Sequence, residues 1–151
     1  MRTFTITATS PASVDLVWKY YSSIHNYPAY VPFLKKIIMT DPVAEGSYWE
    51  DVTVILWIPM TIPHIITSLK PQQEISFTMT LPFHGTMSHV YGVKKHGEGS
   101  RVQCTITFDL GNPVINFLLG ALLERRLRYM VTSILQTIEQ NHAGTVLQTI
   151  S

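Results

Sequence analysis

Residues 101–110 read RVQCTITFDL, and residues 111–143 continue as GNPVINFLLGALLERRLRYMVTSILQTIEQNHA. In the first stretch every second side chain is apolar, which is typical of a strand with one buried and one wet face. Asn112 and Pro113 then supply a helix cap and a first-turn proline. Beyond Gly120, neither proline nor glycine occurs until Gly144. The sequence therefore predicts a strand and then a helix of about 30 residues, about 45 Å long, that ends at Gly144.

The predicted helix carries one apolar stripe that needs a partner surface. Its members recur at three- and four-residue spacing: Leu119, Leu123, Leu127, Met130, Ile134 and Ile138. The basic residues Arg125, Arg126 and Arg128 fall on other faces. A helix of this kind buries its stripe against another element, so we expect a sheet to lie along it.

The segments before residue 101 alternate in the manner of further strands. The period of two predicts strands over residues 3–8, 35–40, 48–56, 64–69, 75–80 and 86–94. After the first strand, Ser10 and Pro11 are expected to cap and begin a helix of about three turns. Pro28 and Pro32 limit the next segment to a short helical turn. We predict an α+β fold in which a seven-stranded, curved antiparallel sheet wraps around the long C-terminal helix, in one domain of residues 1–151.

Composition and motifs exclude several classes of protein. The 151 residues carry a formal net charge of +1, which offers no electrostatic footprint for nucleic acid. Cys104 is the single cysteine, so an internal disulfide and a cysteine zinc cluster are excluded. The sequence contains no signal-peptide pattern, no spanning apolar run, and no phosphate-loop, dinucleotide or Gly-x-Ser-x-Gly motif. We expect a cytoplasmic protein, monomer or homodimer, that holds no metal and no cofactor.

The connections between the predicted strands differ between the two ends of the sheet. In an antiparallel meander alternate connections share an end. Those after the second, fourth and sixth strands are polar, whereas residues 57–63, 81–85 and 111–117 are apolar. Since loops are usually polar, three apolar ones indicate a ligand portal, a closed end of the core, or a surface for a membrane or partner. The predicted portal rim consists of Trp57, Met60, Phe83 and His84.

An apolar pocket between the sheet and the helix would be lined by their facing side chains. The expected lining residues are Phe77, Met79, Met87, His89, Tyr91, Ile106, Phe108, Phe117 and Leu118. His89 and Tyr91 share one strand face, so they would place a base and a phenol in the pocket. Ordinary packing in the core or at the surface is the alternative for both.

Four other titratable residues could carry chemistry: Glu50, Asp51, His64 and His84. Glu50 and Asp51 are neighbours on a strand and point to opposite faces, so they cannot pair in one pocket. We interpret both as solvated strand residues. His64 and His84 lie in or beside the apolar connections, where a histidine could act as a gate or a polar anchor. No ordered ligand spacing surrounds them, which argues against a metal site.

The ordered set of short motifs resembles one family across nearly the whole chain. The motifs are Ser10–Val14 with Val17 and Trp18, Asn26–Pro28 with Pro32, Gly46 with Tyr48, Pro71, Ile75–Phe77, Gly99–Val102 and Leu123–Leu127. They are similar to those of the polyketide cyclase/dehydrase and lipid-transport family of the START and Bet v 1-like (SRPBCC) superfamily. This resemblance implies the helix-grip fold. Residues 27–33 are also similar to the coenzyme Q-binding branch, which adds a quinone or isoprenoid to the candidate ligands.

Three functions fit these features. The first is binding or transport of a hydrophobic small molecule, such as a lipid, a quinone or a polyketide-like compound, in an internal cavity. The second is an acid/base cyclase or dehydratase of the same family, in which His89 and Tyr91 would move protons on a polyketide-like substrate. The third is peripheral docking to a membrane or protein through the predicted portal rim. The missing catalytic motifs favour the first, with no catalytic residue.

Overall fold

The computed structural model describes residues 1–54 and 57–150, with side chains described up to residue 143. The strands are β1 (Arg2–Ser10), β2 (Leu34–Ile38), β3 (Tyr48–Thr53), β4 (Met60–Lys70), β5 (Glu74–Thr80), β6 (Thr86–His96) and β7 (Gly99–Asp109). The helices are α1 (Val14–Ser22), α2 (Pro113–Ile150) and two 3-10 segments, η1 (Ile24–Ala29) and η2 (Pro82–His84). The last two residues of the predicted strand 48–56 lie outside the described residues.

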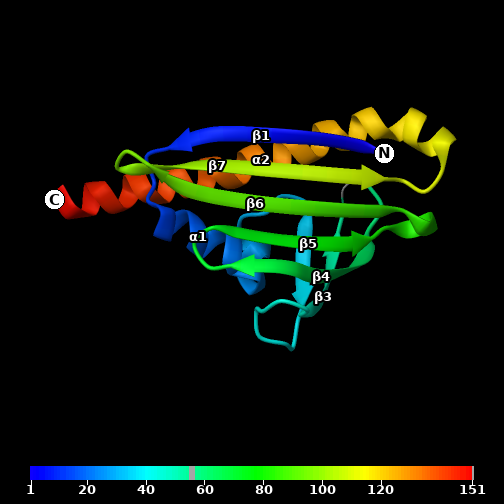
Figure 1. The fold of residues 1–151 in the computed structure, drawn as a ribbon, viewed down its shortest axis with the longest axis horizontal. Coiled ribbons are helices and arrows are strands. Elements are labelled where there is room, and N and C mark those ends of the chain that lie inside the picture. The colour runs from blue at the N-terminus through cyan, green and yellow to red at the C-terminus, as the bar shows by residue number, and fades with distance from the viewer. Residues whose placement is uncertain (55–56, 151) are drawn as a thin grey trace.

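The strands form one antiparallel sheet in the order β1-β7-β6-β5-β4-β3-β2 (Figure 1). Strands β2 to β7 follow one another as a meander, and β1 joins the free edge of β7. The long helix α2 lies along one face of this curved sheet, and α1 and η1 follow β1 in the chain (Figure 1). The predicted α+β fold with seven strands around a C-terminal helix is confirmed.

The start of α1 differs from the prediction. Ser10 stays extended because it pairs with Ser100 at the end of the β1–β7 ladder, so it cannot cap a helix. Ser13 is the N-cap instead, and its Oγ accepts the backbone N–H of Leu16 at 3.2 Å. Proline therefore precedes the cap rather than occupying the first helical position.

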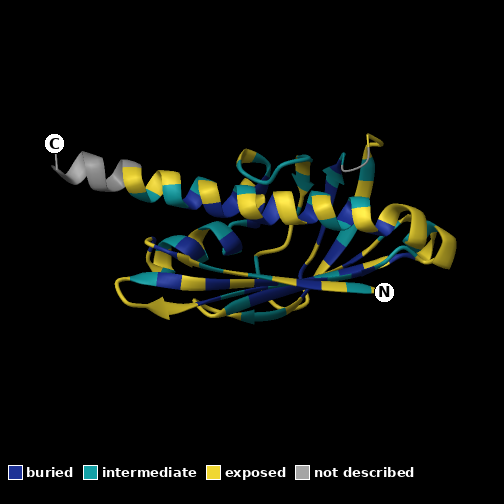
Figure 2. Cartoon of the chain, turned by 90° about the horizontal axis from the view of Figure 1, so that it is seen from above, coloured by how far each residue is buried: buried dark blue, intermediate teal, exposed yellow. Residues whose placement is uncertain are grey.

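The end of α2 also differs from the prediction, because the helix continues through Gly144 to Ile150. A glycine inside a helix costs only about 1 kcal/mol relative to alanine, which is too little to end it alone. The predicted apolar stripe is buried from Leu123 to Ile138. Its first member, Leu119, is 37% exposed, and most residues of the first two turns of the helix are exposed (Figure 2).

No helix in the described part of the chain is long and apolar enough to cross a membrane.

The buried apolar residues form one core cluster between the sheet and the helices. The apolar face predicted for β7 is buried: Val102, Cys104, Ile106 and Phe108 are each at most 2% exposed.

Candidate functional site

Strand pairing aligns a row of large side chains across the concave face of the sheet. Trp49 on β3 pairs with His64 on β4, and His64 pairs with Met79 on β5. Met79 then pairs with Met87 on β6, which in turn pairs with Phe108 on β7. The row therefore brings together residues that are distant in the sequence, under the cover of α2.

A cavity of about 70 Å³, here called the inner cavity, lies between this row and the helices. Its sheet wall includes Trp49, Asp51, Thr53, Ile62, His64, Phe77, Met79, Met87, His89 and Tyr91. Its helical wall includes Tyr20 and Tyr21 from α1, Tyr27 from η1, and Leu127, Met130 and Ile134 from α2. The wall is thus aromatic and apolar, with several titratable side chains set into it.

Asp51 and His64 form a buried acid–imidazole pair in this wall. His64 Nε2 lies 3.2 Å from Asp51 Oδ2, and both residues are less than 10% exposed. His64 Nδ1 lies 2.9 Å from the carbonyl oxygen of Ile62. Because a carbonyl only accepts, Nδ1 carries a hydrogen, and one further proton must lie between Nε2 and Oδ2.

The position of that shared proton follows from burial. Burial raises the pKa of Asp51 to about 7 and lowers the pKa of His64 to about 4. Both pKa shifts favour the uncharged form of each residue over an ion pair. In the uncharged form the Asp51 carboxylic acid carries the proton and faces a neutral His64 imidazole. Below a pH of about 7 the pair retains this proton and is neutral overall in either form.

Two polar atoms of this wall have no hydrogen-bond partner among the described residues: Trp49 Nε1, a donor, and Asp51 Oδ1, an acceptor. The Trp49 ring stacks on the His64 imidazole, with the ring centres 4.6 Å apart and the planes 19° apart. Trp49 and Asp51 lie two positions apart on β3, so they share its concave face. Such buried, unpaired groups are rare and indicate a site for something besides protein.

The neighbouring polar side chains are already paired. His89 Nδ1 lies 3.1 Å from the Tyr91 hydroxyl, and His89 Nε2 lies 3.1 Å from the Met87 sulfur. The Tyr27 hydroxyl donates to the carbonyl oxygen of Tyr21. Burial lowers the pKa of His89 to about 3 and raises the pKa of Tyr91 well above 10. Neither group is poised to exchange a proton near neutral pH.

A second, almost wholly apolar cavity of about 220 Å³ lies between β4, η2 and the start of α2. We call it the vestibule. Its wall includes Ile58, Met60, Phe83, Leu110, Ile115, Leu119 and Leu123. Ile62, Leu81 and Met87 line both cavities, so these three side chains form the partition between them.

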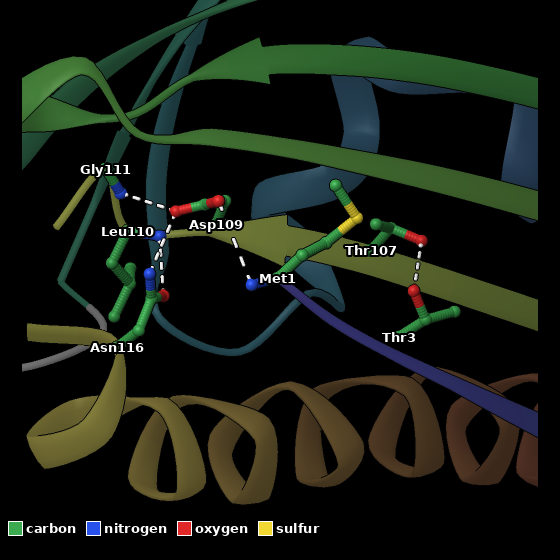
Figure 3. A network of polar contacts seen from close by, with 7 residues as sticks. All are labelled: Met1, Thr3, Thr107, Asp109, Leu110, Gly111 and Asn116. Carbon is green, nitrogen blue, oxygen red and sulfur yellow. Dashed lines mark hydrogen bonds and ion pairs between the residues drawn. The ribbon is translucent and has the colours of Figure 1, made fainter. Parts of the chain in front are cut away.

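A network of polar contacts joins the end of β7 to the first turn of α2 (Figure 3). The Asn116 amide accepts the Leu110 N–H at 2.8 Å and donates to Asp109 Oδ1 at 2.9 Å. The Gly111 N–H donates to the same Asp109 oxygen at 2.8 Å. Asn112 caps the helix by accepting the N–H of Val114 at 2.8 Å. Hydrogen bonds made by the Asp109, Asn112 and Asn116 side chains therefore brace the connection between β7 and α2.

The structure gathers only part of the predicted lining. Phe77, Met79, Met87, His89 and Tyr91 line the inner cavity, as predicted. Ile106 and Phe108 are buried in the core without lining either cavity. The placement of Phe117 and Leu118 in the pocket is wrong: they are 84% and 66% exposed, because the first turns of α2 extend beyond the part of the helix that the sheet covers.

Only two of the four residues of the predicted portal rim line the vestibule. Met60 and Phe83 line the vestibule, but Met60 is the first residue of β4 rather than part of a loop. Trp57 is 73% exposed and its ring lies beneath the Arg126 guanidinium, 5.2 Å away. His84 is exposed and faces a polar hollow near Asp109 and Asn116, so it is not a gate to the apolar vestibule.

In the most polar part of the site, Trp49 and Asp51 were not predicted as site residues, whereas His64 was considered as a gate or a polar anchor. The interpretation of Asp51 as a solvated residue is wrong, since it is 7% exposed and lines the inner cavity. The alternation Trp49, Asp51, Thr53 on a strand with Glu50 and Val52 between them could have placed Asp51 on the tryptophan face. The residues that the structure describes contain no group of three metal-ligating side chains.

Solved structures show that this architecture is widespread. Ara h 8.0201 is 17% identical, with a TM-score of 0.74 over 97% of this chain and 98% of that chain. The Zhui aromatase/cyclase from a Streptomyces species is 17% identical, with a TM-score of 0.73 over 92% and 94% of the two chains. A START superfamily protein from Mycobacterium smegmatis is 13% identical, with a TM-score of 0.76 over 91% and 97%.

Sequence comparison identifies a family for this chain but no individual curated relative. No functionally curated protein matches the chain. Residues 1–143 match the family described as polyketide cyclase / dehydrase and lipid transport. Since this match covers almost the full 151 residues, the protein belongs to the polyketide cyclase/dehydrase and lipid-transport family, with the Bet v 1-like helix-grip fold.

Proposed function

We propose that the protein binds a hydrophobic small molecule, with the apolar body of the ligand in the vestibule and one end in the inner cavity. The observation that carries this proposal is that Ile62, Leu81 and Met87 line both the apolar vestibule and the buried inner cavity, so the two compartments are adjacent. Pockets for drug-sized ligands measure roughly 300–1,000 Å³, so such a ligand needs both compartments. Burial of its apolar surface supplies most of the affinity.

Native mass spectrometry of the protein purified from its own host tests the proposal directly. A stoichiometric apolar adduct, identified after organic extraction, is the expected result. A tryptophan that fills the vestibule provides a second test: Leu119→Trp should weaken binding of the extracted compound about tenfold, since it occupies the space of the ligand. Ala121→Trp, on the exposed face of the same helix, is the control. Equal affinity of both variants would contradict the proposal.

Proton transfer on a polyketide-like substrate is a second candidate function. The observation that favours it is the Asp51–His64 pair, which shares a proton and has an acid with a pKa of about 7 inside the inner cavity. This pair suits acid/base work near neutral pH better than His89 and Tyr91 do. In an assay with an aromatic polyketide precursor, His64→Gln should abolish turnover and spare binding, whereas His89→Gln should reduce neither by more than a few-fold. The reverse pattern would restore the role predicted for His89.

Docking to a membrane is a third candidate, favoured by the apolar side chains at the vestibule end. These side chains, the apolar rim, are Trp57, Ile58, Phe83, Val114, Phe117 and Leu118, and each is at least 64% exposed. Two of them, Ile58 and Phe83, also line the vestibule, an arrangement that suits a carrier that loads its ligand from a bilayer. The double variant Phe117→Ser, Leu118→Ser should lose flotation with phosphatidylcholine–phosphatidylserine vesicles. Ile65→Ser, exposed on β4, is the control. Absence of flotation by the wild-type protein would remove this candidate.

A further inference from the structure

The inner cavity combines an unpaired donor and an unpaired acceptor on one face of β3. Trp49 is 1% exposed and Asp51 is 7% exposed, and both residues line the cavity. Trp49 Nε1 and Asp51 Oδ1 form no hydrogen bond with any part of the chain that the structure describes. A buried polar group without a partner costs roughly 1–3 kcal/mol, so both atoms favour a ligand that supplies the missing partners.

Both atoms are held in place by their neighbours. The second oxygen of Asp51 is engaged by His64 Nε2 at 3.2 Å, which prevents the carboxyl group from turning away. His64 is anchored in turn by the Ile62 carbonyl at 2.9 Å and stacks on the Trp49 ring. Cross-strand pairing of Trp49 with His64, and of Asp51 with Ile62, fixes all three on adjacent strands. Donor and acceptor are thus preorganised before any ligand arrives.

The chemistry of the two atoms selects the ligand group. A hydroxyl both donates and accepts, so it offers the donor that Asp51 Oδ1 lacks and the acceptor that Trp49 Nε1 lacks. A ketone or ether oxygen cannot donate to Asp51, and an ammonium group cannot accept from Trp49. A carboxylate would require an anion to be buried beside Asp51 without a cation, since no Lys or Arg lines the inner cavity of the described chain.

The dimensions of the site select the rest of the ligand. The inner cavity, at about 70 Å³, accommodates a terminal group rather than a whole lipid. The vestibule beyond Ile62, Leu81 and Met87 is apolar and larger, at about 220 Å³. Building on the binding function proposed above, we infer that Trp49 and Asp51 recognise the terminal hydroxyl of an apolar alcohol or phenol, which enters with its hydroxyl first.

Five probes of equal chain length test this inference: 1-decanol, decane, 1-methoxydecane, decanoate and decylamine. Their affinities are measured by displacement of the fluorescent dye 1-aminoanthracene from the purified protein. We expect 1-decanol to bind about tenfold more tightly than decane or the ether, because only the alcohol both donates and accepts. The two charged probes should bind more weakly than 1-decanol.

Four variants assign the preference to the two atoms. Trp49→Phe removes the N–H but keeps an aromatic ring, and it should reduce the preference for alcohol over alkane about fivefold. Trp18→Phe, the same change outside both cavities, should leave the preference intact. Asp51→Leu should abolish it. Asp51→Asn should retain it, since the amide can donate to His64 Nε2 and still present an oxygen to the cavity.

The possible outcomes separate the inference from the function beneath it. If decane and 1-decanol bind with equal affinity, or if Trp49→Phe and Asp51→Leu keep the full preference, hydroxyl recognition by these residues is wrong while the binding function stands. Tighter binding of decanoate or decylamine also overturns it. If none of the five probes displaces the dye, the proposed binding function itself fails.

Discussion

At the scale of single residues, the protein keeps its buried titratable groups uncharged by pairing some and shifting others. In the folded chain Asp51 and His64 hold one proton between them. Between the lowered pKa of His64, about 4, and its ordinary value of 6.5, the unfolded chain also holds one, on His64. Since the two states bind equally many protons, this pair contributes almost no pH dependence to stability in that range.

The balance should be lost in Asp51→Asn. The asparagine cannot titrate, so His64 alone then binds fewer protons when folded than when unfolded, between pH 6.5 and about 4. The free energy of unfolding of this variant should therefore fall as the pH drops through that window, more steeply than in the wild type. Urea unfolding at pH 7.0, 5.5 and 4.5 measures the difference, and parallel pH profiles would contradict the shared proton.

Among the residues that the structure describes, His89 has no acidic partner to compensate its lowered pKa. Burial lowers its pKa from 6.5 to about 3, so the unfolded chain takes up a proton at mild acidity while the folded chain does not. Stability is therefore complete above pH 6.5 and is lost as the pH falls toward 3, by roughly 5 kcal/mol. His89→Gln should flatten this acid limb, although it loses some stability at pH 7.

The control for this change is His96→Gln, since His96 is exposed on the same strand. Thermal unfolding from pH 7.5 to 4 compares the three proteins. An acid limb of unchanged slope in His89→Gln would show that another group causes the acid sensitivity.

The sequence could not reveal the Asp51–His64 pair, because the pairing depends on register. Asp51 and His64 are brought together by the β3–β4 ladder, in which Trp49 pairs with His64 and Asp51 with Ile62. Strand boundaries alone do not specify that alignment. His89 and Tyr91, by contrast, lie two positions apart on one strand, and their proximity was predictable from the period of two.

At the scale of elements, the turn η2 combines two bulky residues in the left-handed region of backbone conformation. Phe83 has a φ of 61° and His84 has a φ of 64°. For side chains with a Cβ this conformation costs roughly 1 kcal/mol or more, whereas glycine adopts it freely. The carbonyl oxygen of Phe83 also lies where a Cβ on Gly111 would have to be, so η2 and the β7–α2 connection fit together closely.

Phe83→Gly should therefore raise the free energy of unfolding by about 0.5–1 kcal/mol, because strain is relieved and little buried area is lost from a side chain that is 78% exposed. The same substitution in the helix, Phe117→Gly, should instead destabilise by about 0.5 kcal/mol. Urea unfolding of both variants gives the comparison. Destabilisation of both to the same extent would show that the Phe83 side chain stabilises the fold through its contacts at the vestibule.

The two ends of α2 show what periodicity alone leaves undetermined. The burial of the stripe from Leu123 to Ile138 was predicted correctly, because apolar residues recur at helical spacing along the part of α2 that the sheet covers. The same spacing continues into Leu119, where the covering sheet ends. The length of a helix relative to its sheet is a property of the assembled fold, and so the exposure of Phe117 and Leu118 was not foreseen.

At the scale of the whole molecule, the sheet encloses two compartments whose separation depends on few side chains. Ile62 lies on β4 and Leu81 follows β5, and both are backed by strand or turn structure. Met87 is unbranched and has several rotatable bonds, so it is the member of the partition that can move aside at least cost. A ligand that occupies both compartments must displace it.

Met87→Ala should merge the inner cavity with the vestibule. The loss of a buried methionine side chain destabilises the fold by roughly 2–4 kcal/mol, because a cavity remains. A ligand that fills this space should then recover part of that loss, so the rise in melting temperature on addition of 1-decanol should be larger for Met87→Ala than for the wild type. Met79→Ala is the matched control, since Met79 lines the inner cavity but not the vestibule. It should be destabilised similarly, and 1-decanol should stabilise it no more than the wild type. Equal stabilisation of the two variants would place the barrier between the compartments elsewhere than at Met87.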